Sequence, residues 1–422
     1  MSFLFPSQLK HFGIHLLDEA RSPKNQLHVH KHLYTRIHGV WYDFAKFDHP
    51  GGPIALNLAK DRDATVLFES HHLLSKIDMN KILSKYKVEA KVAQDLCTID
   101  PRDNGAHYKW DNFHTDPFVK DIKNLLMTHF GAIAKRHNCT LYQATKASKE
   151  RWSLLGILAL AVITTLPYYI GGQWWTLFVL PPTAWILFIN YWHDSLHFSL
   201  SSDWRTNASL PYLLPILSSP WLWYHEHIIG HHAYTNVGMK DPDIAHAPQL
   251  KREHESVAWK RSHEHQGTFF RYALVWSIAT NIGLNLFSDL KTNLKLSYNN
   301  VVGYNKLSRS RLILHGIGRV VYLYMMFMWP LFLFPFRKSA AFIVIPNVLL
   351  SCCFMVNSQI SHLTEECSNA SDTNFLKHQV ITAQNFGCDS LFCMLFSGGL
   401  NYQIEHHLFP FVNHCHLPFL GA

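Results

Sequence analysis

The sequence predicts a protein of two parts, in which a small α+β unit precedes an all-α membrane domain with four transmembrane helices. Three observations support this prediction. The 422 residues exceed a usual single soluble domain. A mixed, polar N-terminal region changes after Arg151 into long apolar runs. The 30 histidines equal the acidic residues in number, which suggests metal binding. We place the α+β unit at residues 1–95, a linker with an amphipathic helix at 96–150 and the membrane domain at 151–422.

The N-terminal unit contains alternating and helical patterns in close succession. Strands are expected at Leu33–Ile37 and Val40–Phe44, and helices at Pro53–Ala59 and Ala64–Leu73. The linker leads into an amphipathic helix near Val119–His129. The first ten residues lack the charged and apolar regions of a signal peptide, so we expect the N-terminus to stay in the cytosol.

Four apolar runs in the C-terminal part approach the roughly 20 residues that cross a bilayer. They are Ser153–Ile170, Trp174–Trp192, Arg311–Phe336 and Ala340–Asn357. Short connections within the first pair and within the second predict two transmembrane hairpins. Both termini then lie on the cytosolic side.

The net charge of +8 comes from scattered Lys and Arg residues, and no nucleic-acid motif accompanies them. We therefore expect no nucleic-acid partner, and attraction to the anionic lipids of a membrane instead. The eight cysteines show no C-x-x-C spacing, which argues against a zinc ribbon or a disulfide scaffold.

Three histidine clusters follow the apolar segments. They contain the pair His193 and His197, the trio His227, His231 and His232, and the doublet His406 and His407, with Gln403 one turn before the doublet. Imidazole-rich sets suit iron, copper or zinc, and seven imidazoles are too many for one ion, so two metals are implied. His362 is a candidate eighth ligand, with a solvated or supporting role as the alternative. Any single pair taken alone has a simpler explanation as helix-surface or core histidines.

The three clusters read HDxxH, HxxxHH and QxxHH, and in this order they resemble the membrane fatty-acid desaturases. The Gln that opens the third box is similar to that of front-end desaturases and of sphingolipid desaturases. The resemblance implies a cytosolic helical cap with two non-haem irons and O2 as co-substrate. It implies catalytic roles for His193, His197, His227, His231, His232, Gln403, His406 and His407, and iron ligation by these histidines together with His362.

The N-terminal unit carries Phe47-Asp48-His49-Pro50-Gly51-Gly52, which is similar to the haem-binding signature of cytochrome b5. By this resemblance His49 is the first axial ligand of a haem b and His72 the second, with His71 as the alternative. A bis-histidine haem has no open position, so it transfers electrons and does not bind oxygen. NADH-cytochrome b5 reductase is the expected electron source.

Together these features predict a front-end fatty acyl desaturase that acts on an acyl-CoA or acyl-lipid in the endoplasmic reticulum membrane, with its active site in the cytosol. We expect residues of Phe188–Trp192 and Trp221–Tyr224 to line an acyl tunnel, although tryptophans there also suit membrane-interface packing. A sphingolipid long-chain-base desaturase and a catalytically inactive membrane haem electron carrier are the alternatives.

Overall fold

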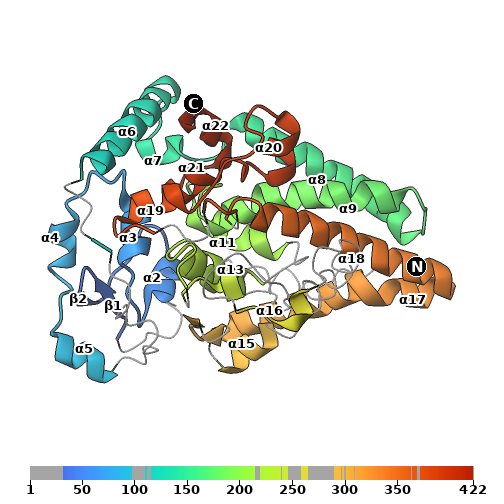
Figure 1. Cartoon of the computed structure of the whole chain (residues 1–422), viewed down its shortest axis with the longest axis horizontal. Coiled ribbons are helices and arrows are strands. Elements are labelled where there is room, and N and C mark those ends of the chain that lie inside the picture. Colours follow the sequence, from blue (N-terminus) through green and yellow to red (C-terminus); the bar gives the residue numbers. More distant parts are fainter. Residues whose placement is uncertain are drawn as a thin grey trace, which may run out of the picture.

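The computed structural model describes residues 32–96, 110–111, 116–213, 219–238, 240–245, 258–264, 289–295, 297–298, 301–307, 309–362, 364–367 and 371–421. They form a small α+β unit and a larger helical part, and the two lie against each other (Figure 1).

The α+β unit is built on the hairpin of β1 (Tyr34–Ile37) and β2 (Val40–Asp43), which pair antiparallel. Its two turn residues, His38 and Gly39, have φ values of 48° and 75°, as a tight hairpin turn requires. The helices are α2 (Pro53–Ala59), α3 (Thr65–His72), α4 (Met79–Leu83) and α5 (Ala90–Leu96). The expected strands and helices are confirmed to within one residue at each end.

Helix α6 (Pro117–His137) is longer than the amphipathic helix expected from the sequence. The Asp116 carboxylate caps its first turn, and Asn138 ends it in a left-handed conformation. Its buried side chains, including Leu126 and Phe130, pack in one cluster with Val66 of α3 and with C-terminal residues. The short helix α7 (Leu141–Ala144) follows. The linker helix is therefore part of the core that joins the two parts.

Among the described residues, three helical stretches are long and apolar enough to cross a membrane: Lys149–Ile170, Arg309–Leu333 and Phe336–Gln359. The first is α8 and the third α18, and the second consists of α16 (Arg309–Leu323), the π-helical turn η8 (Tyr324–Met328) and α17 (Trp329–Leu333). On α8, Ile157, Leu160 and Ile163 are each more than 60% exposed. Such apolar side chains suit a lipid environment, so several apolar helices mark this part as membrane protein.

The expected span Trp174–Trp192 differs from these three. It is α9 (Thr176–Phe188), which continues into the π-helical turn η3 (Ile189–His193). Helix α9 packs against both α8 and α18, and the long helices run side by side away from the α+β unit (Figure 1). More of α9 is buried than of α8, because it lies between two neighbours.

Shorter elements fill the space between the long helices and the α+β unit (Figure 1). They are α10 (Asp194–Leu196), α11 (Trp204–Ser209), η4 (Leu210–Tyr212), α12 (Pro220–Trp223), η5 (Tyr224–His231), α13 (Pro242–Ala245), η6 (Arg261–His263), α15 (Asp289–Lys295), the paired strands β3 (Ser297–Tyr298) and β4 (Val302–Gly303), α19 (Phe375–Ile381), α20 (Leu391–Ser397), α21 (Gln403–Leu408), η9 (His414–His416) and α22 (Leu417–Leu420). The histidine clusters lie in this layer.

Candidate metal and haem sites

Eight histidines from four separate parts of the chain converge in the interior, and none is more than 8% exposed. Their ring nitrogens form two main groups, each within 4.8 Å: His193, His197, His227 and His406 in the first, and His231, His362 and His407 in the second. His232 lies within the same distance of His406 and His407. The structure thus brings together every histidine that the sequence suggested as an iron ligand.

A wide helical turn explains how the second cluster directs three histidines inward. Segment η5 is π-helical, and the backbone N–H of His232 donates to the carbonyl of His227, five residues earlier, at 2.8 Å. On an α-helix, His232 would point about a quarter-turn away from His227 and His231. On the wider turn, the residues four and five positions after His227 both lie near its face, while His231 and His232 still point about a quarter-turn apart. Such π-helical turns occur frequently at functional sites.

The distances between the facing ring nitrogens equal the separation of two neighbouring nitrogen ligands on one metal ion. The Nε2 atom of His227 lies 3.0 Å from that of His193 and 3.1 Å from that of His232. The Nε2 atoms of His232 and His406 are also 3.1 Å apart. Two nitrogen ligands at about 2.1 Å from one ion, at right angles, are ~3.0 Å apart. The spacing of His193, His227, His232 and His406 is therefore that of nitrogen ligands around a metal ion.

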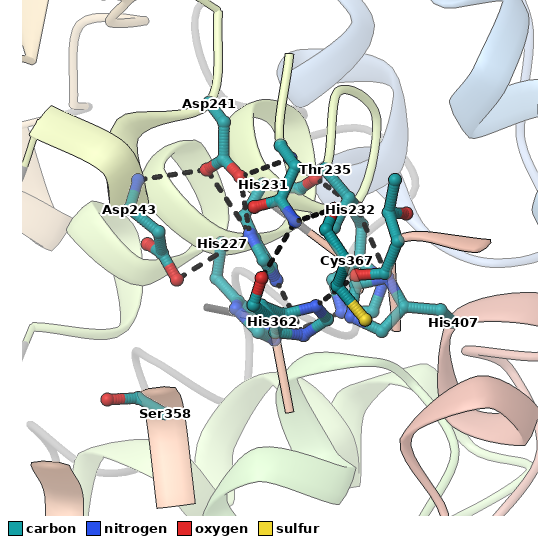
Figure 2. A network of polar contacts seen from close by, with 12 residues as sticks. His227, His231, His232, Thr235, Asp241, Asp243, Ser358, His362, Cys367 and His407 are labelled. Carbon is teal, nitrogen blue, oxygen red and sulfur yellow. Dashed lines mark hydrogen bonds and ion pairs between the residues drawn. The ribbon is translucent and has the colours of Figure 1, made fainter. Parts of the chain in front are cut away.

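The second group shows why a cation is needed. The Nδ1 of His231 faces both carboxylate oxygens of Asp241 at 3.2 Å (Figure 2). The Nδ1 of His362 faces the carbonyl of Thr382 at 2.9 Å. Because these partners only accept, both Nδ1 atoms carry hydrogen, and the two Nε2 atoms keep their lone pairs. These Nε2 atoms are 3.3 Å apart. Two lone pairs at this distance repel unless a proton or a metal ion lies between them.

The electrostatics of the buried imidazoles agree with this interpretation. Burial lowers the pKa of His227, His232, His406 and His407 well below its usual value, so these rings are neutral, as metal ligands must be. His231 differs: burial lowers its pKa, but Asp241 and Asp243 outweigh burial and raise it to about 9. In the metal-free protein a proton therefore occupies the position that a cation would take.

Outer contacts hold other ligand rings in place. His407 Nδ1 donates to the amide oxygen of Gln379 at 2.8 Å, which leaves its Nε2 without a partner among the described residues. His414 lies behind His406, with its Nε2 3.0 Å from the Nδ1 of that ring. The Nδ1 of His414 in turn lies 3.0 Å from the carboxylate of Asp194. These contacts fix which nitrogen of each ring points inward.

Asp194 itself is fully buried and pairs with Arg151 of α8 at 3.2 Å. Glu226 and Glu405 are also buried, and Glu405 accepts from the side chain of Asn385 at 2.8 Å. Burial therefore excludes a solvated position for these three carboxylates. Asp194 contacts His414, which in turn lies behind the candidate ligand His406.

Gln403 lies inside the cluster, with its amide nitrogen 2.8 Å from His362 Nε2 and its oxygen without a partner in the described part of the chain. The orientation of an amide is inferred from its contacts. If the amide is turned over, its oxygen faces the metal position beside His362.

His225 is close to the second histidine cluster in the sequence, but its contacts are those of a structural residue. Its Nδ1 donates to the carbonyl of Trp221 at 2.8 Å, and its Nε2 accepts from the backbone of Asn305 at 3.0 Å. It is a buried structural histidine of η5 and does not lie in a polar loop.

Sequence reasoning did not assign roles to Asp241, Gln379 or Thr382, which contact the ligand rings. The signal that could have found Asp241 is the Asp-Pro-Asp triplet ten residues after His231.

A pocket opens beside both metal groups. Its polar lining includes His193, His227, His231 and His362 together with Glu226, Asp243, Asn357, Ser358 and Gln403, and its apolar lining includes Trp185, Ile189, Trp223, Phe354 and Leu400. Ile189 and Trp223 belong to the stretches that were expected to line an acyl tunnel. Trp185, Phe354 and Leu400 lie outside those stretches. A pocket with one apolar wall and one imidazole wall can hold a hydrocarbon chain against a metal.

In the α+β unit, the structure pairs His49 with His72. Their ring centroids lie 5.9 Å apart, with perpendicular planes. Two imidazoles that bind one iron from opposite sides at about 2 Å place their centroids ~6 Å apart. The Nδ1 of His72 donates to the Phe68 carbonyl at 2.7 Å, so its Nε2 remains for the iron. Burial lowers the pKa of His49 to about 4, which keeps that ring neutral. The residues therefore fit a haem.

Comparisons with known proteins agree with this geometry. The model of the fatty acid desaturase family matches residues 172–422, which is more than half of the chain. The chain belongs to the fatty acid desaturase family. Residues 24–90 of this desaturase match the cytochrome b5-like haem/steroid-binding domain. Family membership makes the protein an oxidoreductase that desaturates fatty acyl chains, and it implies iron in the histidine cluster and haem in the N-terminal domain.

Curated relatives are similar over nearly the whole desaturase. An acyl-lipid omega-13 desaturase of Chlamydomonas reinhardtii is 25% identical over 92% of this chain and 86% of its own length. An acyl-lipid (8-3)-desaturase of Mortierella alpina is 24% identical over 92% and 85%. The Delta(5) fatty acid desaturase A of Dictyostelium discoideum is 25% identical over 89% and 80%. No solved structure matches the chain.

Proposed function

We propose that this desaturase is a front-end enzyme with two iron ions, which inserts a cis double bond between an existing double bond and the carboxyl end of an acyl chain. The observation that carries the proposal is the pair of buried histidine groups beside a partly apolar pocket. The front-end assignment draws on Gln403 and on relatives named Delta(5) and (8-3) desaturases.

Each iron has its own set of ligands in this proposal. His193, His197, His227 and His406 hold one ion, and His231, His362 and His407 hold the other. His232 lies beside both groups and completes one of them. Gln403 supports the second ion beside His362, directly or through a water molecule.

The chain's residues act mainly by positioning. Trp185, Ile189 and Phe354 would hold the acyl chain in one register, and a fixed register makes hydrogen removal selective. When bound, the iron ions supply the dioxygen chemistry that removes two hydrogens from adjacent methylene carbons. Per double bond, one O2, two electrons and two protons are consumed and two waters are formed. His49 and His72 would hold a haem that supplies these electrons, and NADH-cytochrome b5 reductase would re-reduce it.

The proposed setting is the endoplasmic reticulum membrane. In this topology, α9 with η3 is a fourth span beside the three long apolar stretches. Four spans return the chain to the side where it started, so both termini and the helical cap lie in the cytosol. There the pocket can take an acyl-CoA or an acyl-lipid.

Product analysis tests the proposal. The chain is expressed in a host that lacks long polyunsaturated lipids, beside the variants His406→Ala and His137→Ala, with fatty acids that differ in length and unsaturation. His137 is an exposed histidine at the end of α6, so its variant controls for histidine loss as such.

Fatty acids and long-chain bases are then profiled by mass spectrometry. We expect a new unsaturated acyl product in the wild type and the His137→Ala variant, and none in the His406→Ala variant. A new double bond in a long-chain base would instead identify a sphingolipid desaturase. The absence of product and of non-haem iron, with a normal haem spectrum, would identify an electron carrier.

A further inference from the structure

Helix α3 has two histidines in succession that face different sites. His72 pairs with His49 at the haem position. His71 instead lines a cavity whose other walls include His197, His232 and His407. One short helix of the haem domain therefore lies between the haem position and the metal ligands.

The orientation of His71 leaves a nitrogen available toward this cavity. Its Nδ1 turns back to its own helix, 3.1 Å from the Leu67 carbonyl and 3.0 Å from the Ser70 hydroxyl. On the facing side, both ring nitrogens of His197 and the Nε2 of His407 lack hydrogen-bond partners within the described residues. The cavity is thus bordered by a haem-domain imidazole and by candidate ligand imidazoles of both iron groups.

This cavity is separate from the acyl pocket. The acyl pocket is lined by His193, His227, His231 and His362. The cavity at His71 is lined by His197, His232 and His407. The two sets have no histidine in common, so an acyl chain and the haem domain approach the metal cluster through different openings.

Apolar packing holds the haem domain in this position. Ile54 and Leu58 of α2 lie in the same buried cluster as Trp185 and other residues of the desaturase domain. Val66 of α3 and Leu73, which directly follows α3, pack with residues of α6, α19 and α21. These side chains are 1–8% exposed, so the hydrophobic core is continuous across the contact between the two domains.

Glycine permits one close approach. Gly52, the last residue of the haem signature, has a φ of 84°, and a Cβ there would collide with the indole of Trp204 in α11. A side chain at this position would therefore push the two domains apart, in addition to the strain of a left-handed conformation.

A polar cluster fixes the register of the contact. Arg62 of the haem domain is 5% exposed and donates to the carbonyl of Gly303 at 2.9 Å and to the side-chain oxygen of Asn305. The amide of Asn305 donates back to the Lys60 carbonyl at 3.2 Å. The backbone N–H of Asn305 donates to His225, which joins this cluster to η5. A buried guanidinium with this fixed set of acceptors specifies one docking geometry.

We propose that His71 is the bridging residue for electron transfer from the haem to the metal cluster, and that Arg62 holds the haem domain docked so that this route exists. The inference rests on the proposed function. In each transfer the haem iron is oxidised by one electron and the metal cluster is reduced by one electron. The external reductase replaces the electron on the haem, and two such transfers supply one double bond.

Stopped-flow spectroscopy of the full-length enzyme, loaded with haem and iron, tests this route. The haem is first reduced, the enzyme is mixed with acyl substrate and O2, and reoxidation is followed in the Soret band. In His71→Leu, a variant of similar volume, we expect reoxidation to slow about tenfold, which corresponds to ~1.4 kcal/mol in the transfer barrier. The haem spectrum, the haem midpoint potential and the iron content should stay at wild-type values.

A second readout separates this inference from the function. Enzyme whose iron is reduced chemically, without the haem route, forms product in a single turnover. His71→Leu should match the wild type in that experiment. If wild-type protein forms no product, the proposed function fails. If it forms product and His71→Leu reoxidises its haem at the wild-type rate, only the route through His71 is refuted. Iron loss in His71→Leu would make His71 a ligand and would also overturn the inference.

The docking role of Arg62 has a test that needs no activity. In Arg62→Ala, hydrogen–deuterium exchange at residues 65–72 and 403–408 should increase, and haem reoxidation should slow about tenfold as the docked population falls. Lys81→Ala is the matched control, because Lys81 is an exposed cation on α4 of the same domain. Unchanged exchange in Arg62→Ala would refute the docking role.

Discussion

Asp241→Asn should weaken iron binding at the second metal group while preserving the fold. The Asp241 carboxylate is 1% exposed and accepts the Nδ1 hydrogen of His231 at 3.2 Å. It also accepts the backbone N–H groups of Asn236 at 2.8 Å and Asp243 at 2.9 Å. An asparagine keeps one oxygen, but its amide hydrogens then face one of these donors.

Two opposing effects decide the size of the change. Without Asp241, the pKa of His231 falls from about 9, so a proton competes less with the metal. The carboxylate, however, attracts a dication about twice as strongly as it attracts a proton, so its removal costs more than it gains. Loss of a contact that orients a ligand ring typically lowers metal affinity about 10–100-fold. We expect a reduction in this range.

Chelator competition on purified enzyme, with retained iron measured by mass spectrometry, gives the affinity directly. Asp243→Asn is the control, because its oxygen lies 3.5 Å from His231 Nδ1 and its side chain is partly exposed. We expect that control to retain iron much better. Wild-type iron affinity in Asp241→Asn would refute the view that this carboxylate supports a metal ligand.

Three further changes test other parts of the structure. Arg151→Met leaves the buried Asp194 carboxylate without its cation, which should destabilise the protein by ~3–5 kcal/mol, and adding Asp194→Asn should recover part of the loss in thermal unfolding. Ile189→Trp fills the apolar side of the acyl pocket, so product profiles should move toward shorter chains; an unchanged profile would place the acyl chain elsewhere. His49→Ala should abolish the Soret band and NADH-driven turnover while non-haem iron stays bound, and loss of both cofactors would contradict two separate sites.

Local patterns allowed much of the fold to be predicted. The hairpin at Tyr34–Asp43 and helices α2 and α3 agree with expectation because alternation and helical periodicity act over a few residues. The apolar runs were also visible in composition. The residue at which α9 ends was not visible in composition. The apolar run lies between two neighbouring helices, and it continues as a π-helical turn where its side chains reach the histidine site.

The candidate site likewise has features that the sequence predicts and features that only the fold determines. The spacing of the histidine boxes predicted seven of the eight rings, since residue type and interval are local features, and His362 outside the boxes was a candidate for the eighth. The partition into two groups depends on which rings meet across the fold, which spacing along the chain does not give. Supporting residues such as Gln379 and His414 are ordinary in sequence and become significant only because the chain returns to the ligand rings.

The adjacent histidines of α3 illustrate the limit of sequence reasoning best. Resemblance to cytochrome b5 treats His71 and His72 as alternatives for one role, because only one can face the haem. On a helix, neighbouring residues point about 100° apart, so assigning His72 to the haem necessarily directs His71 elsewhere. In an isolated haem domain that direction leads to solvent. Here Ile54, Leu58 and Val66 bury the same side of the domain against the desaturase, and the direction leads to the metal ligands. The position of His71 beside the metal ligands is therefore determined by the docking surface between the domains, and the haem signature does not predict it.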